Sequence, residues 1–164
     1  MGLSGGIDSA VVALLCQRSF PRHHLVLTLP CASPPGVTAR ARLLVQKFNL
    51  NWCHVDLTAA YQQLLAVVEP EGIDAKESAV RLARANLKAR LRMSTLYYHA
   101  NRLSYLVVGT DNWPEWYSGY FTKHGDGAAD MAPIIHLLKR DVRQSAALLG
   151  VPTAIVAAAP SADL

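Results

Sequence analysis

A short glycine-rich string directly before an apolar run constrains this chain more than any other feature. Residues 4–9 read Ser-Gly-Gly-Ile-Asp-Ser, and residues 10–15, Ala-Val-Val-Ala-Leu-Leu, are all apolar. Adjacent glycines let the backbone turn sharply and come close to a ligand. The apolar run predicts a helix, and the first N–H groups of a helix, together with its dipole, favour anions. The string therefore predicts a phosphate-binding loop that leads into a helix.

The polar residues of this loop indicate more than a simple anion site. Ser4 and Ser9 can donate hydroxyl hydrogen bonds to phosphate oxygens. Asp8 would repel phosphate unless it holds Mg²⁺, a hard cation that bridges carboxylates and phosphates. The Gly-Lys-Ser/Thr signature of a Walker A loop is absent from the loop. A plain helix cap at Asp8 is the alternative, and the complete string favours the phosphate loop.

Predicted strands and helices alternate along the chain. Strands are predicted at residues 24–30, 51–56 and 104–109, of which the last is the clearest. Helices are predicted at residues 37–48, 57–68, 76–102 and 139–149, and residues 110–138 are rich in loops. This order predicts an α/β fold, with a doubly wound, mostly parallel sheet and helices on both faces. Ligands of such sheets bind beyond the carboxyl ends of the strands, which is where Thr110 lies.

Length and composition predict one globular domain. The chain has 164 residues, is 51% hydrophobic and carries a net charge of +4. It has no apolar run of the roughly 18 residues that a spanning helix needs, and its start lacks the features of a signal peptide. We therefore expect a cytoplasmic protein without a membrane segment. Only three residues precede Ser4, so we expect residues 1–164 to be a single domain that lacks most of its first strand and its C-terminal segment.

The glycine-rich loop resembles the pyrophosphate loop of the N-type ATP pyrophosphatases. That superfamily includes NAD synthetase, GMP synthetase, asparagine synthetase and enzymes that modify tRNA. The resemblance implies an adenine nucleotide alpha hydrolase-like fold. It also implies that ATP is split into AMP and pyrophosphate, with an adenylated intermediate. The loop alone does not identify the substrate.

Further segments narrow the resemblance to one family. Residues 86–93 read Asn-Leu-Lys-Ala-Arg-Leu-Arg-Met, and residues 107–110 read Val-Val-Gly-Thr. Glu115 follows, and residues 119–126 then read Gly-Tyr-Phe-Thr-Lys-His-Gly-Asp. In this order and spacing, the segments resemble NAD synthetase of the ammonia-dependent type over nearly the whole chain. The implied partners are deamido-NAD, ATP and ammonia, without nucleic acid.

The resemblance also implies roles for particular residues. The residues expected to contact ATP are Gly2, Leu3, Ser4, Gly5, Gly6, Ile7, Asp8, Ser9, Thr110, Lys139 and Ser161. Those expected to contact deamido-NAD are Arg90, Lys123 and Asp130. Asp8 and Glu115 are the expected Mg²⁺ ligands. No side-chain nucleophile is required, so catalysis would consist of positioning and charge neutralisation.

The long predicted helix bears on assembly. Two apolar arcs run along it, one of Leu82, Ala89, Met93 and Leu96, and the other of Val80, Leu87, Leu91 and Tyr98. A helix that is apolar on two sides is buried on two sides. NAD synthetases are homodimers, so one arc could face a partner subunit. The alternative is that both arcs lie inside one domain.

Two other functions and one local question remain open at this point. A basic stripe of Arg81, Arg84, Lys88 and Arg92 could bind tRNA in another ATP pyrophosphatase, although a solvated helix face is the favoured explanation. A truncated, inactive relative would keep the fold without turnover. Trp113 and Trp116 could cover the site or form a subunit contact.

Overall fold

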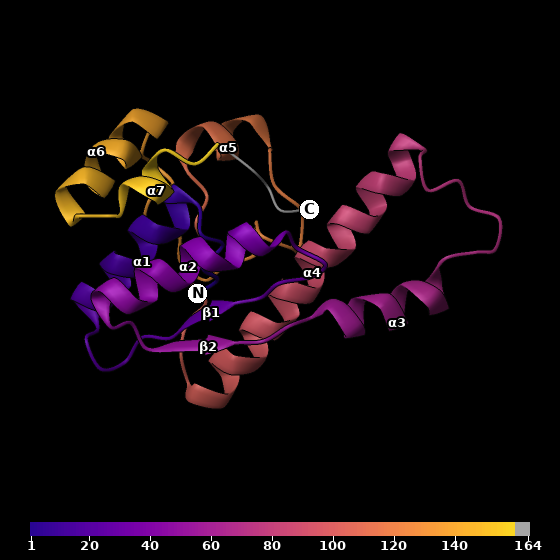
Figure 1. The fold of residues 1–164 in the computed structure, drawn as a ribbon, viewed down its shortest axis with the longest axis horizontal. Coiled ribbons are helices and arrows are strands. Elements are labelled where there is room, and N and C mark those ends of the chain that lie inside the picture. The colour runs from indigo at the N-terminus through magenta and orange to yellow at the C-terminus, as the bar shows by residue number, and fades with distance from the viewer. Residues whose placement is uncertain (160–164) are drawn as a thin grey trace.

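The computed structural model describes residues 1–159, apart from the side chains of residues 35 and 37. The elements alternate as predicted as far as α3, and only helices follow along the described part of the chain (Figure 1). In chain order they are α1 (Ile7–Ser19), β1 (Val26–Thr28), α2 (Pro35–Phe48), β2 (Trp52–His54), α3 (Thr58–Val68), α4 (Ser78–Leu103), α5 (Trp113–Ser118), α6 (Lys139–Leu149) and α7 (Thr153–Val156). The short helices α5 and α7 were not predicted from the sequence.

The sheet is parallel and small. β1 pairs with β2, with Val26 opposite Trp52 and Thr28 opposite His54. The N-terminal residues lie beside β1, because Leu27 N–H donates to Met1 O over 2.9 Å and Leu3 N–H donates to Leu27 O over 2.8 Å. This third parallel segment leads directly into the glycine-rich loop. The α/β class with a parallel sheet is therefore confirmed, with two strands in the part of the chain that the structure describes.

The prediction of a strand at residues 104–109 is wrong. α4 continues to Leu103, and Ser104 takes a left-handed conformation that ends it. The segment then forms a single parallel bridge, between Val108 and Met131, and Gly109 N–H donates to Met131 O over 2.7 Å. A turn begins at Pro133, a residue without an N–H to donate. The neighbouring segment is therefore too short to extend the bridge into a ladder.

Two apolar clusters hold the fold. In the larger one, α1 packs against α2, α6 and α7, with Leu14, Leu44, Val142 and Ile155 at 0–2% exposure. The smaller cluster lies under α3 and α4 and contains Leu27, Leu29, Cys31, Leu57 and Tyr61. Figure 1 shows α1, α2, α6 and α7 grouped together, with α3 and α4 extending away from them.

The middle of α4 is covered by the same chain. Leu87 and Leu91 of one arc and Leu96 of the other pack against the smaller cluster. Each arc is open at one end, since Leu82 is 62% and Tyr98 65% exposed. Within residues 1–159, none of the helices has the length and apolar character needed to cross a membrane.

Candidate active site

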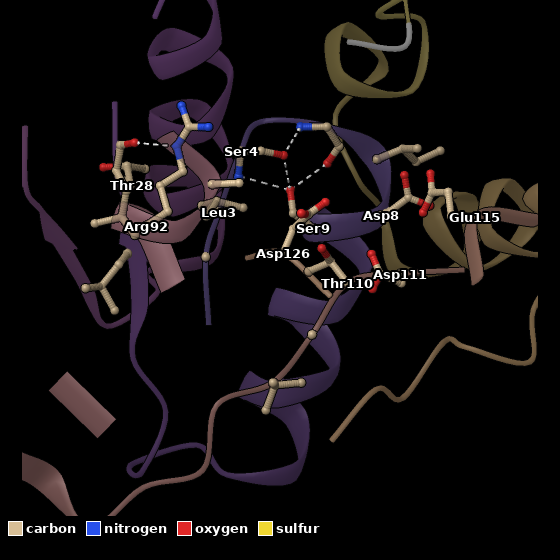
Figure 2. A pocket seen from close by; sticks show the side chains of 18 of the residues that line it. Leu3, Ser4, Asp8, Ser9, Thr28, Arg92, Thr110, Asp111, Glu115 and Asp126 are labelled. Carbon is tan, nitrogen blue, oxygen red and sulfur yellow. Dashed lines mark hydrogen bonds between the residues drawn. The ribbon is translucent and has the colours of Figure 1, made fainter. Parts of the chain in front are cut away.

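The glycine-rich loop is held rigidly at the start of α1. Gly5 has a φ of 76°, a left-handed conformation that glycine adopts without strain. Ser9 Oγ donates to Gly6 O over 3.0 Å and lies 3.0 Å from Ser4 Oγ, and Gly6 N–H donates to Ser4 Oγ over 3.2 Å (Figure 2). Gly6 is the N-cap of α1, so Asp8 lies inside the first turn and the plain capping role for Asp8 is wrong.

Three helices bring two carboxylates and a lysine together. Asp8 comes from the first turn of α1, Glu115 from α5, and Lys139 is the first residue of α6. Lys139 Nζ lies 2.6 Å from Asp8 Oδ2 and 3.5 Å from Glu115 Oε1. Figure 2 shows Asp8 and Glu115 side by side, on the opposite side of the pocket from Arg92. The two residues predicted to share a metal thus converge from positions more than 100 residues apart in the sequence.

Asp111 is a further carboxyl group that interacts with Asp8 and Glu115. Desolvation by burial, followed by the charges of Asp126, Glu115 and Asp8, raises the pKa of Asp111 from 3.8 to about 7. Asp111 and Asp126 were not predicted as site residues. Asp111 could have been found from the sequence, because it directly follows Thr110, a predicted site residue.

The donor set suits a magnesium ion. Mg²⁺ prefers oxygen ligands and is commonly held by one or two carboxylates together with substrate phosphates. Asp8 and Glu115 offer oxygens to one point, 2.6 Å and 3.5 Å from Lys139 Nζ. Among the described residues, no group of three or more His, Cys, Asp or Glu side chains could hold a metal by itself. A site of two carboxylates completed by phosphate is therefore the arrangement that fits.

A cavity of about 380 Å³ connects these features. That volume falls within the range of small-molecule sites. Of the predicted ATP residues, the cavity is lined by Gly2, Leu3, Ser4, Gly6, Ile7, Asp8, Ser9, Thr110 and Lys139. Gly5 lies behind the lining, where its carbonyl accepts from Arg40 Nε over 3.2 Å. Ser161 lies outside the described residues.

Basic side chains that were not predicted also line the cavity. Arg40 of α2 and Arg143 of α6 belong to this group. Arg92 of α4 lies beside Thr28 (Figure 2), and its Nε donates to Leu29 O over 3.0 Å. The sequence placed Arg92 on a solvated stripe, and this placement is wrong because the β1–α2 loop folds over it. These arginines and Lys139 are four cations that can contact phosphate oxygens, and they face four acidic side chains of the same lining, Asp8, Asp111, Glu115 and Asp126.

The residues predicted to contact deamido-NAD lie outside this cavity, and two of them, Arg90 and Lys123, are in contact. Arg90 Nε donates to Lys123 O over 3.3 Å, which joins α4 to the loop of residues 119–130. The Asp130 carboxylate accepts from Val107 N–H over 2.7 Å and from Tyr97 Oη over 3.2 Å. Within the described chain, the cavity lining includes Gly125 and Asp126 of this loop but not Arg90, Lys123 or Asp130.

The two tryptophans are half-exposed beside the site. Trp113 is 44% and Trp116 49% exposed. The Trp116 ring stacks on Phe121 with centroids 5.2 Å apart, so it braces the start of the 119–130 loop against α5. Neither tryptophan is among the described residues that line the cavity.

Comparison with known proteins identifies the family. A family model described as NAD synthase matches residues 1–164. The chain belongs to the NAD synthase family. Two relatives, each named NH(3)-dependent NAD(+) synthetase, come from Mesoplasma florum and Carboxydothermus hydrogenoformans and are 44% and 46% identical over 164 residues. Both alignments cover 100% of this chain and 66% of the relative, so the chain spans slightly less than two thirds of their length.

Solved structures agree with the family assignment. The structure of NMN synthetase from Francisella tularensis matches with a TM-score of 0.90 and 38% identity, over 99% of this chain and 65% of the other. NAD⁺ synthetase from Burkholderia pseudomallei matches with a TM-score of 0.83 and 32% identity, over 99% and 62%. The resemblance found in the sequence is therefore confirmed over the whole chain.

Proposed function

We propose that the complete protein is a ligase that converts deamido-NAD to NAD with ATP and ammonia, releasing AMP and pyrophosphate. One observation carries this proposal. Asp8, Glu115 and Lys139 converge on the glycine-rich loop at the edge of a cavity lined by both acidic and basic side chains, in a chain that matches NAD synthase throughout. We propose a cytoplasmic location, where ATP and the nucleotide substrate are available. For the complete domain we propose the doubly wound sheet expected from the alternation of elements.

The loop and the basic residues would bind the ATP phosphates. The N–H groups at the start of α1 point toward the cavity end of the helix and favour an anion. Residues 2–9, Thr110, Lys139 and Ser161 make up the proposed ATP site. Arg40 and Arg143 would add positive charge along the phosphates. Bound by Asp8 and Glu115, Mg²⁺ would offset the charge that develops on pyrophosphate as it leaves.

The chemistry needs two displacement steps. A carboxylate oxygen of the nicotinate group attacks the α-phosphorus of ATP, and the bond from that phosphorus to the bridging oxygen breaks, which releases pyrophosphate. The ammonia nitrogen then attacks the carbonyl carbon of the acyl adenylate. The bond to the AMP oxygen breaks, one proton is lost from nitrogen, and the amide results. The residues of the chain contribute orientation and charge rather than a covalent intermediate.

The 119–130 loop would hold the nicotinate substrate. Arg90 and Lys123 can pair with its carboxylate and phosphates, because both side chains are exposed on neighbouring elements. Asp130 already binds Val107 N–H and Tyr97, so its proposed contact with deamido-NAD would have to share this carboxylate. The conflict makes Asp130 the least supported of the three residues.

A mononucleotide substrate is the second candidate. The structural relative from Francisella tularensis is named an NMN synthetase. Both candidate products contain the same amide on the same ring, so the site around the reacting carboxylate would be shared. The part of the substrate beyond the first phosphate would distinguish them.

The test is an ammonia-dependent assay with ATP and Mg²⁺, with deamido-NAD and nicotinate mononucleotide supplied separately. Chromatography would follow the amide and AMP, which should appear in equal amounts. Asp8→Asn and Glu115→Gln should each lower kcat by at least about 100-fold, a typical loss when a group that stabilises transition-state charge is removed. Glu71→Gln, which changes an exposed glutamate between α3 and α4, is the matched control and should leave the rate unchanged.

Three outcomes would contradict parts of the proposal. Near-normal turnover in either site variant would remove its metal role. If product forms from nicotinate mononucleotide but not from deamido-NAD, the mononucleotide is the substrate and deamido-NAD is not. ATP binding without any product would favour the inactive relative.

We also propose that the active form is a homodimer, supported by the exposed apolar side chains of Leu82 and Tyr98 on α4.

A further inference from the structure

Asn112 is a buried polar residue between the two carboxylates of the site. It is 0% exposed and caps α5. Its Nδ2 donates to Asp8 Oδ1 over 2.9 Å, and its Oδ1 accepts from Glu115 N–H over 3.2 Å. Its own backbone N–H donates to Glu115 Oε2, also over 3.2 Å. One residue therefore holds an oxygen of each carboxylate.

The remaining oxygens face a common point. Lys139 Nζ lies 2.6 Å from Asp8 Oδ2 and 3.5 Å from Glu115 Oε1. These are the oxygens that Asn112 does not bind. Asn112 thus fixes one side of each carboxylate and leaves the other side directed at the cation. This is the arrangement in which outer partners orient metal ligands in proteins.

The choice of asparagine follows from this double role. Glu115 N–H can only donate, so the amide oxygen of Asn112 must face it and the NH₂ group must face Asp8. Helix capping alone would be served as well by Asp or Ser. Aspartate would put a second carboxylate against Asp8, and serine is too short to span the same distance. A neutral amide supplies the acceptor and the donor together.

We infer that Asn112 is a positioning residue that sets the metal-binding orientation of Asp8 and Glu115. It acts through these two side chains and does not itself line the cavity among the described residues. The inference rests on the magnesium site of the proposed function. It assigns a role to a residue that the sequence motifs did not single out.

The test is Mn²⁺ binding, measured by electron paramagnetic resonance with and without α,β-methylene-ATP. Asn112→Ser keeps a capping oxygen for Glu115 N–H but loses the donor to Asp8. We expect it to weaken Mn²⁺ binding by about 10- to 100-fold, as loss of an outer partner does in other metal sites. In turnover, the Mg²⁺ concentration for half-maximal rate should rise while KM for the nicotinate substrate stays constant. A purely structural role would not produce that split.

Asn51→Ser is the matched control. Asn51 Nδ2 donates to His24 O over 2.8 Å, away from the site, so the same chemical change should leave Mn²⁺ affinity unaltered. Wild-type affinity in folded Asn112→Ser would overturn the inference. If that variant does not fold, Asn112→Asp takes its place, because it matches Asn112 in volume and keeps the cap. Wild-type Mn²⁺ affinity in Asn112→Asp would likewise overturn the inference. Mn²⁺ binding by wild type without amide formation would contradict the proposed function alone, whereas no Mn²⁺ binding by wild type would overturn this inference.

Discussion

At the scale of single residues, the site is defined by crowded carboxylates. Burial, with smaller contributions from the charges of Asp126, Glu115 and Asp8, raises the pKa of Asp111 to about 7. Lys139 pairs with two of the four, Asp8 and Glu115. Clustered carboxylates destabilise the folded state, and they favour binding of a divalent cation together with phosphate.

Asp111→Asn should stabilise the protein in a pH-dependent way. The folded pKa of Asp111 is raised above its unfolded value of 3.8. Its ionisation therefore destabilises the folded state increasingly as pH rises from about 4 to about 7, and the penalty is constant above that. Because Asp111 is only partly buried and solvent screens its neighbours, the gain at pH 8 is about 1–2 kcal/mol. Urea unfolding in EDTA at several pH values measures it.

Asp56→Asn provides a control of opposite sign. Hydrogen bonds from Thr58 lower the pKa of Asp56. Its ionised form therefore contributes stability above its unfolded pKa, and this contribution is lost as pH falls through the folded value. Asp56→Asn should be less stable than wild type at pH 8 and equal to it in strong acid. A stability difference for Asp111→Asn that does not change between pH 4 and pH 8 would contradict the assignment.

Local sequence predicted the contiguous loop, and distant site residues such as Glu115 and Lys139 were predicted only through the family resemblance; distant contacts outside those motifs were missed. Residues 4–9 could be read because a glycine turn and a helix start need only neighbouring residues. Asn112 meets Asp8 across 104 positions, and Arg92 meets Leu29 across 63. Helical periodicity placed Arg92 on a solvated stripe, since periodicity does not show which loop will cover a face.

At the scale of elements, the 119–130 loop depends on close contact with α4. Thr122 is buried, and its Oγ1 donates to Asn86 Oδ1 over 2.8 Å. Its backbone N–H donates to Asp126 Oδ1, also over 2.8 Å. A Cβ on Gly125 would lie 2.8 Å from Thr122 Cγ2 and 3.0 Å from Ala89 Cβ on α4. The loop can approach the helix because residue 125 has no side chain.

Gly125→Ala should therefore displace the loop from α4. Overpacking of this kind costs about 1–3 kcal/mol. We expect KM for the nicotinate substrate to rise about 10-fold or more, because Lys123 moves with the loop, and ATP affinity to fall as well, because Gly125 and Asp126 line the cavity. Steady-state kinetics and calorimetric ATP titration measure the two effects. Gly36→Ala in α2, where the nearest atom is Arg40 Nη1 at 3.9 Å, should leave both unchanged and gain up to about 1 kcal/mol from helix propensity. Equal effects of the two substitutions would refute the packing argument.

Helices were easier to predict than strands, for a physical reason. Helix boundaries depend on local signals, and α6 begins and ends at the predicted residues 139 and 149, with Gly150 in the left-handed conformation. A strand needs a partner of sufficient length. Residues 104–109 have the composition of a strand, but Pro133 shortens the segment beside them.

At the scale of the whole molecule, the cavity joins the two apolar clusters. Leu3 and Ile155 belong to the larger cluster, Leu27 and Leu29 to the smaller one, and all four line the cavity. α4 packs on the smaller cluster through Leu87, Leu91 and Leu96, and Leu82 and Tyr98 stay exposed. Coverage by this chain alone therefore accounts for most of both arcs, as the single-domain alternative predicted, but not for Leu82 and Tyr98.

The exposed side chains of Leu82 and Tyr98 on α4 predict assembly. A partner subunit that covers one arc would bury Leu82 or Tyr98, which are 62% and 65% exposed. Burying such a side chain contributes about 1.5–3 kcal/mol, and a charge in its place would oppose association. At least one of Leu82→Arg and Tyr98→Arg should thus raise the dimer dissociation constant by 10-fold or more, measured by light scattering across a concentration series. Leu148→Arg, at an 85% exposed position on α6, is the matched control. A wild-type monomer at all concentrations, or dimers unaffected by both substitutions, would show that these side chains remain in contact with solvent.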